Sequence, residues 1–315
     1  MKMKYNEPVK MIWPEPLKPG DKVAVTAPSS PVSDEKFEMS VESIKFLGLD
    51  PVVMPSCHMS HGYLAGPDKQ RADDINTAFA DNTIKGIFCL RGGYGTTRLL
   101  PMLDFEMIRN NPKVFIGYSD ISSLHFNLNQ KCGLITFHGP MPTTDYRVHE
   151  GFTNDSLRAC LFAPEKLKTI GNPEGEEIKT LREGFAKGTL TGGNLSLLAG
   201  TLGSPYEIDT RGKILFIEDV DEELYIIDKN LTALSLAGKF SDCSGIILGT
   251  FERCTPQDHP TLSLMEIFEE IVVPYNKPTI LNLRSGHIYP QSTLPMGAEV
   301  NFEAKDGIKN ISVVY

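Results

Sequence analysis

Short apolar runs alternate with longer amphipathic stretches along the first half of the chain. Five runs rich in β-branched and aromatic residues predict strands, at residues 22–28, 51–56, 85–90, 114–119 and 134–140. The stretches at residues 34–48 and 67–81 have the apolar spacing of surface helices, and Ser33 is a suitable N-cap for the first of them. Strands that alternate with helices predict a parallel sheet covered on both faces.

The same alternation returns in the second half of the chain. Strands are predicted at residues 213–220, 244–251 and 278–283, helices at 191–203, 225–238 and 261–273, and a final hairpin around Asp306 and Gly307. Between the halves, a polar segment that contains Gly and Pro predicts a linker. The expected fold class is α/β: an N-terminal parallel-sheet sandwich at 14–150, a linker at 151–186, and a smaller, β-rich α/β domain at 187–315.

Composition and charge narrow the classes of function. The net charge of −9 and the absence of a Lys and Arg cluster argue against a nucleic-acid partner or an anionic membrane surface. No stretch reaches 18 consecutive apolar residues, so no transmembrane helix is expected. The six scattered cysteines and the lack of an export signal predict reduced thiols in a cytoplasmic protein; the alternative is a protein whose export signal has been removed.

Ser119 lies where a predicted strand turns into a helix. One interpretation is an N-cap, because Ser and Asp accept hydrogen bonds from the first helical amides. The other is a nucleophile held on a sharp turn, although Ile121 occupies the place of the second Gly in the hydrolase pattern G-x-S-x-G. A serine nucleophile needs a base and an orienting acid, and His287 and Glu218 follow predicted strands. Seven His and many Ser and Glu make other combinations equally possible by spacing.

Other polar groups have less specific interpretations. Residues 91–95, Arg-Gly-Gly-Tyr-Gly, fit a phosphate loop, an oxyanion hole or a tight turn. Cys57, His58 and His61 lack further ligands at metal-site spacing, so we expect a solvated loop and no metal. We expect His125 to be structural and His138 to lie near the site. Asp219 should point away from the face of Glu218, because side chains alternate along a strand.

Several segments together resemble the LD-carboxypeptidase family of serine peptidases. The segments are "LKPGDKVAVTAPSSP", "RGGYGTTRLLPMLDF", "FIGYSDISSLH", "TFHGPM", "LTGGNLSLLAGTLGSPYEIDTRGKILFIEDV", "YIIDKNLTAL" and "GHIYPQSTLPMGAEV". They follow the family's order, and the resemblance covers nearly the whole chain after about Leu17. It implies Ser119 as nucleophile, His287 as base and Glu218 as its orienting acid. It also implies an oxyanion hole from the amides of Gly93 and Asp120, and no metal or organic cofactor.

The resemblance implies a small peptide substrate. Typical members remove the terminal D-alanine from the L-centre of muropeptide tetrapeptides during wall recycling. A microcin C immunity branch of the family instead cleaves peptidyl or aminoacyl adenylates and holds the adenine on an aromatic loop. We expect the carboxypeptidase, because the only Trp, Trp13, lies outside the predicted site. Residues 222–225 depart from the family pattern, so substrate contacts there stay open.

Two further expectations complete the interpretation of the sequence. We expect a homodimer. A non-catalytic α/β binding module remains the alternative from another class of function: residues 91–95 would hold a phosphate or a peptidoglycan fragment, and Ser119 would only cap a helix. The co-occurrence of Glu218 and His287 in matching motifs favours the enzyme.

Overall fold

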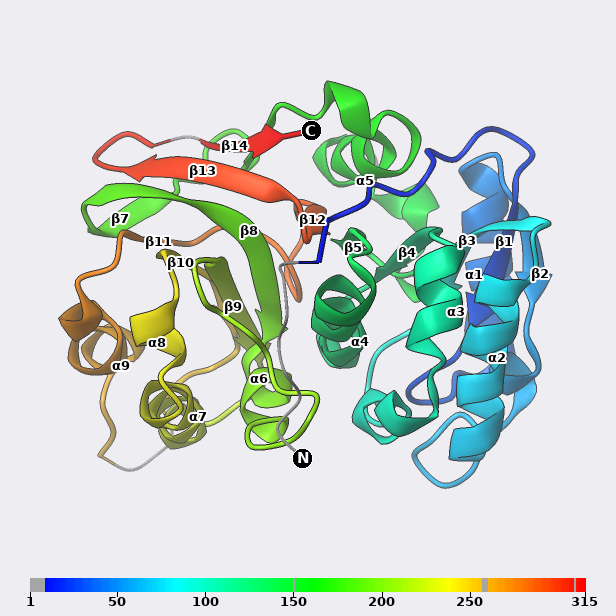
Figure 1. Ribbon diagram of the computed structural model, residues 1–315, viewed down its shortest axis with the longest axis horizontal. Helices are drawn as coiled ribbons and strands as arrows, with labels where there is room; N and C mark the ends of the chain where they lie inside the picture. The colour runs from blue at the N-terminus through cyan, green and yellow to red at the C-terminus, as the bar shows by residue number, and fades with distance from the viewer. Residues whose placement is uncertain (1–8, 150, 257–259, 309) are drawn as a thin grey trace.

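The computed structural model describes residues 9–149, 151–256, 260–308 and 310–315. Two sheets lie side by side, with the N-terminal half on the right and the C-terminal half on the left of Figure 1. The first sheet has six strands in the order β12 (Leu294–Met296), β5 (Thr136–His138), β4 (Val114–Gly117), β3 (Ile84–Cys89), β1 (Lys22–Thr26) and β2 (Asp50–Val53). The five N-terminal strands pair in parallel, which confirms the prediction, and β12 joins antiparallel to β5.

Helices cover both faces of this sheet because its strand residues are apolar on both sides. Val23 and Val25 share one core cluster with residues of two helices, α1 (Asp34–Phe46) and α5 (Phe152–Phe162). Ala24, on the opposite face, belongs to a second cluster with residues of α2 (Asp68–Ala80), α3 (Phe105–Asn110) and α4 (Ser122–Asn127). The Ser33 side chain accepts a hydrogen bond from the Lys36 amide, which confirms the predicted N-cap.

The second sheet is mixed and has eight strands. Their order is β6 (Thr169–Gly171), β14 (Asn310–Val314), β13 (Glu299–Ala304), β8 (Gly184–Asn194), β9 (Ile214–Val220), β10 (Gly245–Glu252), β11 (Thr279–Leu281) and β7 (Lys179–Arg182). The central strands β8 to β11 pair in parallel, and β13 and β14 form the predicted hairpin. This sheet confirms the β-rich α/β expectation.

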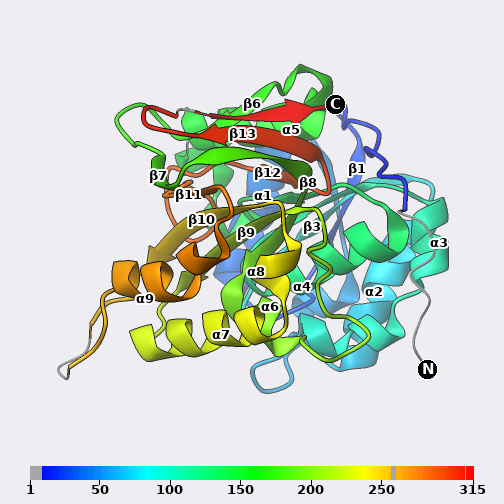
Figure 2. The same cartoon turned by 60° about the vertical axis from the view of Figure 1, so that its left-hand side comes forward.

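The helices of the second half gather on one face of its sheet, where Figure 2 shows α7 and α9. They are α6 (Leu195–Gly200), α7 (Leu224–Leu236), α8 (Lys239–Asp242) and α9 (Leu264–Ile271). The opposite face is in one cluster with the first sheet, since Leu190 and Phe216 share it with Phe137. The two halves therefore share a continuous core. None of the described helices is long and apolar enough to cross a membrane.

The structure corrects two expectations about the middle of the chain. The segment 151–186 is not an irregular linker, because it contains α5, with Leu157 and Leu161 fully buried, and the two edge strands β6 and β7. Edge strands form backbone hydrogen bonds without needing an apolar side-chain period. The polar sequence of β6 and β7 therefore wrongly indicated a linker. The expected helix start at Gly192 and Gly193 is instead the end of β8, and the helix α6 begins at Leu195.

Candidate active site

Ser119 lies on a strained turn at the carboxyl end of β4. Its φ of 68° lies in the left-handed region, which residues other than Gly adopt rarely and at a cost in conformational energy. The turn leads into a short 3-10 segment, Ser119–Ile121, and then into α4. A Cβ on Gly117 would lie 2.9 Å from Cγ1 of Ile121, so this glycine lets the buried Ile121 fold back over the strand. The residue that departs from the hydrolase pattern therefore packs inside the turn.

Glu218 and His287 form a hydrogen-bonded pair across the second half of the molecule. Glu218 is fully buried near the end of β9, and its Oε2 lies 2.8 Å from Nδ1 of His287 in the loop after β11. A Cβ on Gly286 would lie 2.5 Å from that same Oε2, so only glycine allows the loop to pass this close. Asp219 points to the other face, where it accepts hydrogen bonds from Asn194 and Ser196, as strand alternation predicts.

The structure places Ser119 and His287 on the wall of one cavity of about 210 Å³. Its lining residues are Val32, Lys36, Arg91, Gly92, Gly93, Tyr118, Ser119, Met141, Thr143 and His287. The Tyr118 ring lies edge-on to the His287 ring, with centroids 5.0 Å apart. Among the described residues no hydrogen bond joins Ser119 to His287, and such bonds often tighten only when substrate binds. The cavity thus brings a serine and a histidine to one wall, with a buried glutamate bound to the histidine, and these are the three groups that acyl transfer by a serine uses.

The Asp120 side chain joins three loops, a role that the sequence analysis did not identify. Its Oδ2 accepts hydrogen bonds from the Ser29 hydroxyl at 2.6 Å and from the Thr96 amide at 3.0 Å. The Thr96 hydroxyl donates in turn to the Asp120 carbonyl at 2.6 Å. Burial raises the pKa of the Asp120 carboxyl, and these hydrogen bonds oppose that shift. The loops after β1, β3 and β4 are consequently held together behind the Ser119 turn.

A second link crosses between the two halves. The Ser122 hydroxyl accepts a hydrogen bond of 2.9 Å from the backbone N–H of Asn194, at the end of β8. Gly193 makes this approach possible, because a Cβ there would lie 2.7 Å from Cβ of Ser122. The helix that follows Ser119 is therefore tied to the sheet that carries Glu218.

Of the remaining candidates from the sequence, His138 lies beside this site and the others lie apart from it. His58 packs its ring against Phe37, and the buried Cys57 thiol donates to the Val25 carbonyl. Among the described residues no group of three or more His, Cys, Asp or Glu could hold a metal ion. Residues 222–225, at the start of α7, do not line the cavity of Ser119. His138 is fully buried beside the site, with its ring centroid 6.0 Å from that of Tyr118.

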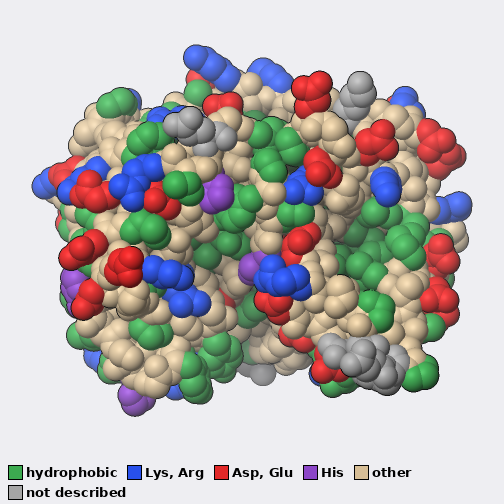
Figure 3. Space-filling model, turned by 180° about the vertical axis from the view of Figure 1, so that it is seen from behind, with side chains coloured by type: hydrophobic (Ala, Val, Ile, Leu, Met, Phe, Trp, Pro, Cys, Tyr) green, Lys and Arg blue, Asp and Glu red, His purple; other side chains and the backbone are tan. Residues whose placement is uncertain are grey.

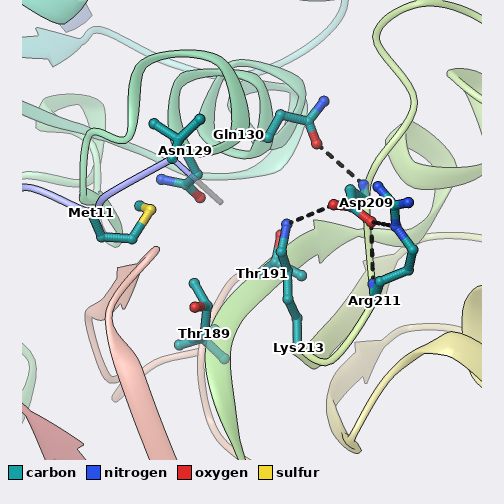
Figure 4. A pocket seen from close by; sticks show the side chains of 10 residues that line it. Met11, Asn129, Gln130, Thr189, Thr191, Asp209, Arg211 and Lys213 are labelled. Carbon is teal, nitrogen blue, oxygen red and sulfur yellow. Dashed lines mark hydrogen bonds and ion pairs between the residues drawn. The ribbon is translucent and has the colours of Figure 1, made fainter. Parts of the chain in front are cut away.

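A second cavity, of about 370 Å³, lies between the end of α4 and strand β8 (Figure 4). Arg211 and Lys213 point toward Asp209, which binds them at 2.8 and 3.5 Å. The Gln130 side chain accepts a hydrogen bond from the Asp209 amide. Both cations thus share one carboxylate, and the described residues that line this cavity include no Ser and no His.

His125 packs directly beneath the Ser119 turn. Because its ring is buried, we expect the stability of the protein to depend on pH. Its ring nitrogens contact the Thr136 hydroxyl and the Gly117 carbonyl, each at 2.8 Å. Burial lowers the pKa of His125 to about 4, against about 6.5 in an unfolded chain. Between these values the unfolded chain binds more protons, so the free energy of unfolding should fall as the pH drops, by up to about 3 kcal/mol.

Urea unfolding from pH 7 to pH 4 measures this effect. Asp219 acts in the opposite direction, because burial raises the pKa of its carboxyl to about 6. The contribution of His125 is therefore the difference in slope between the wild type and His125→Gln, which has no titratable ring. Equal slopes for both proteins would show that His125 does not cause the acid sensitivity.

Comparisons with known proteins match the chain along most of its length. Two family models match, the LD-carboxypeptidase N-terminal domain over residues 23–139 and the LD-carboxypeptidase C-terminal domain over residues 187–302. The "Probable murein peptide carboxypeptidase" of Bacillus subtilis (strain 168) is 41% identical, over 91% of this chain and 90% of its own. The "Murein tetrapeptide carboxypeptidase" of Pseudomonas aeruginosa is 32% identical, over 88% of this chain and 91% of its own.

Solved structures show the same fold. The microcin C7 self-immunity protein MccF superposes with a TM-score of 0.87 at 26% identity, covering 96% of this chain and 98% of that one. Another structure of MccF holds aspartyl sulfamoyl adenosine. With both domain models and a relative of 41% identity matched along the chain, this protein belongs to the LD-carboxypeptidase family of serine peptidases.

Proposed function

We propose that this protein removes the terminal D-amino acid from muropeptide tetrapeptides, with Ser119, His287 and Glu218 as its catalytic triad. The observation that carries the proposal is the shared cavity, which is lined by Ser119 on its strained turn and by His287, the partner of the buried Glu218. The names of the relatives from B. subtilis and P. aeruginosa support the murein peptide as substrate.

The reaction would proceed through an acyl-enzyme. Ser119 Oγ attacks the scissile carbonyl carbon while Nε2 of His287 takes the hydroxyl proton. The Glu218 carboxylate accepts a hydrogen bond from Nδ1–H of His287, which sets the tautomer of the base and stabilises the imidazolium. The imidazolium then gives its proton to the departing amine, and the C–N bond breaks. Water repeats the two steps on the ester and restores Ser119.

The tetrahedral intermediate carries a negative oxygen that needs hydrogen-bond donors. We assign these donors to the backbone amides of Gly93 and Asp120. Gly93 lines the cavity beside Ser119, and Asp120 is in the first turn after Ser119, where helical amides lack an intrahelical partner. A substitution at Gly93 should therefore disturb the chemistry as well as the loop.

Gly93→Ala should lower kcat by roughly 10²–10³. The added Cβ would lie 2.6 Å from Cβ of Ser30, and the φ of 126° is unfavourable for alanine, so the loop and its amide must turn. Gly95→Ala is the matched control: its φ is 134° and its Cβ would lie 2.7 Å from Leu64, but Gly95 does not line the cavity. Steady-state kinetics and melting curves of both variants separate the roles. Equal losses of kcat in both variants would show that Gly93 only shapes a tight turn and does not supply an oxyanion-hole amide.

The adenylate hydrolysis of the immunity branch is the competing function. Tyr118 is the only aromatic residue besides His287 among the described residues that line the cavity. Trp13 packs instead against Phe137 and Tyr315, with ring centroids 6.4 and 4.8 Å apart. The described cavity therefore offers little aromatic surface for a nucleobase, and this favours the peptide substrate.

The choice of substrate is tested with the purified protein and mass spectrometry of the products. A muropeptide tetrapeptide ending in D-Ala should lose only that residue. Blocking its terminal carboxylate as an amide should lower kcat/KM by at least about tenfold, which is about 1.4 kcal/mol. Equal cleavage of acid and amide, or much faster cleavage of an aminoacyl sulfamoyl adenosine, would contradict this function.

The compartment and the assembly are further parts of the proposal. All six cysteines are buried free thiols, which suits the reducing cytoplasm. The homodimer remains a prediction, and light scattering across a range of protein concentrations measures it directly.

A further inference from the structure

The cavity of Ser119 is lined by basic side chains in an acidic protein. The chain has 40 acidic and 31 basic residues, and Figure 3 shows both signs interspersed over one face of the molecule. Of the described residues that line the cavity, two are basic, Arg91 and Lys36, and none is acidic. We propose that Arg91 binds the terminal carboxylate of the substrate and thereby makes the enzyme an exopeptidase. This inference rests on the peptidase function proposed above.

The guanidinium of Arg91 is held in place by backbone carbonyls. Nε donates to the Gly92 carbonyl at 3.1 Å, and Nη1 donates to the Pro31 carbonyl at 3.2 Å. In the described part of the chain Arg91 forms no ion pair, and its Nη2 donates to no protein acceptor. An anchored, partly buried guanidinium without a carboxylate partner is suited to binding an anion from outside the protein.

Other arginines of the same region differ in this respect. Arg98, seven residues further along, binds both carboxylate oxygens of Asp68, and Arg71 is paired with the same Asp68. Lys36 also lines the cavity without an ion pair, but its flexible stem projects from an exposed position on α1. Arg91 is therefore the cation whose position is fixed before substrate binds.

The chemistry of the substrate indicates which anion Arg91 meets. In a peptide with a free C-terminus, only the nitrogen and one α-carbon separate the scissile carbonyl from the terminal carboxylate. Acidic groups on the acyl side are many more bonds away. Gly92 follows Arg91 directly, and a Cβ on Gly92 would lie 3.1 Å from Oγ of Ser119, so the neighbour of Arg91 in the chain lies against the attacking atom. A bidentate bond between guanidinium and carboxylate would then place the last peptide bond of the substrate at Ser119.

The experiment measures discrimination between two substrates rather than activity alone. Wild type, Arg91→Gln, Lys36→Gln and Arg98→Gln are assayed with the tetrapeptide acid, with its C-terminal amide and with an aminoacyl sulfamoyl adenosine. In Arg91→Gln, kcat/KM for the acid should fall at least about tenfold, mainly through KM, while the amide is affected little. The preference for the acid should therefore nearly disappear. Arg98→Gln should keep the wild-type preference, because Arg98 does not line the cavity.

The possible outcomes separate this inference from the proposed function. Equal losses on acid and amide in Arg91→Gln would indicate a purely structural role and overturn the inference, while the peptidase function would stand. Loss of the preference in Lys36→Gln instead would transfer the role to Lys36. A defect confined to aminoacyl sulfamoyl adenosine would show that Arg91 binds the anion of an adenylate. No release of D-Ala by wild type would overturn both proposals.

Discussion

Ser119→Ala should lower kcat by roughly 10⁴–10⁶ while the protein stays folded. Alanine removes the attacking oxygen but keeps the Cβ, so the strained φ of 68° and the contacts of the turn are unchanged. A serine-reactive phosphonate should modify wild type at one site, and mass spectrometry of the peptides should place the adduct on Ser119. Ser119→Ala should not be labelled.

Two other variants serve as controls for the serine. Ser122→Ala removes the hydroxyl that binds the Asn194 amide, so it should lower the free energy of unfolding by about 1 kcal/mol with little effect on kcat. Ser119→Gly should be inactive but more stable than Ser119→Ala by about 1 kcal/mol, because glycine adopts a positive φ without strain. Substantial activity in folded Ser119→Ala would show that another group is the nucleophile and would remove the basis of the proposed mechanism.

Glu218→Gln should lower kcat by roughly 10²–10⁴ with little change in KM. The amide has nearly the shape of the carboxylate, but it cannot stabilise the imidazolium that forms on His287. Glu218 is fully buried and its Oε2 lies 2.8 Å from Nδ1 of His287, so no water replaces the lost charge easily. Steady-state kinetics test this, and circular dichroism checks the fold.

Asp219→Asn is the matched control, because it makes the same chemical change one residue along β9 on the opposite face. Its kcat should stay within about threefold of wild type, since Asp219 contacts Asn194 and Ser196 and not His287. A larger loss of kcat in Asp219→Asn than in Glu218→Gln would show that Asp219, and not Glu218, is the acid that supports the base. Full activity in folded Glu218→Gln would show that His287 needs no buried carboxylate.

Local patterns along the chain were sufficient for much of the fold. The apolar runs predicted the parallel strands β1 to β5, and Ser33 and the Asp306–Gly307 pair predicted a helix start and a hairpin that the structure confirms. The alternation within β9 correctly separated Glu218 from Asp219. These features depend on residues within a few positions of one another, where side-chain period and capping operate.

Pairing between distant segments was beyond the reach of local pattern. The polar segment around β6 and β7 completes the edges of the second sheet, and β12, a three-residue strand near the C-terminus, completes the first. Edge strands of this kind are held by backbone hydrogen bonds to a neighbour, which leave no periodic trace in the sequence.

The candidate site shows the same division. Ser119 was recognisable at the end of a predicted strand, and the family resemblance named its partners, but spacing could not place Glu218 beside a histidine 69 positions away. Three features became visible only in three dimensions: the positive φ of Ser119, the loops joined by the Asp120 carboxylate, and the guanidinium of Arg91, which is bound by two carbonyls and forms no ion pair among the described residues. Side-chain period and capping act along the chain, whereas a catalytic cavity is formed by contacts between strand ends that only packing brings together.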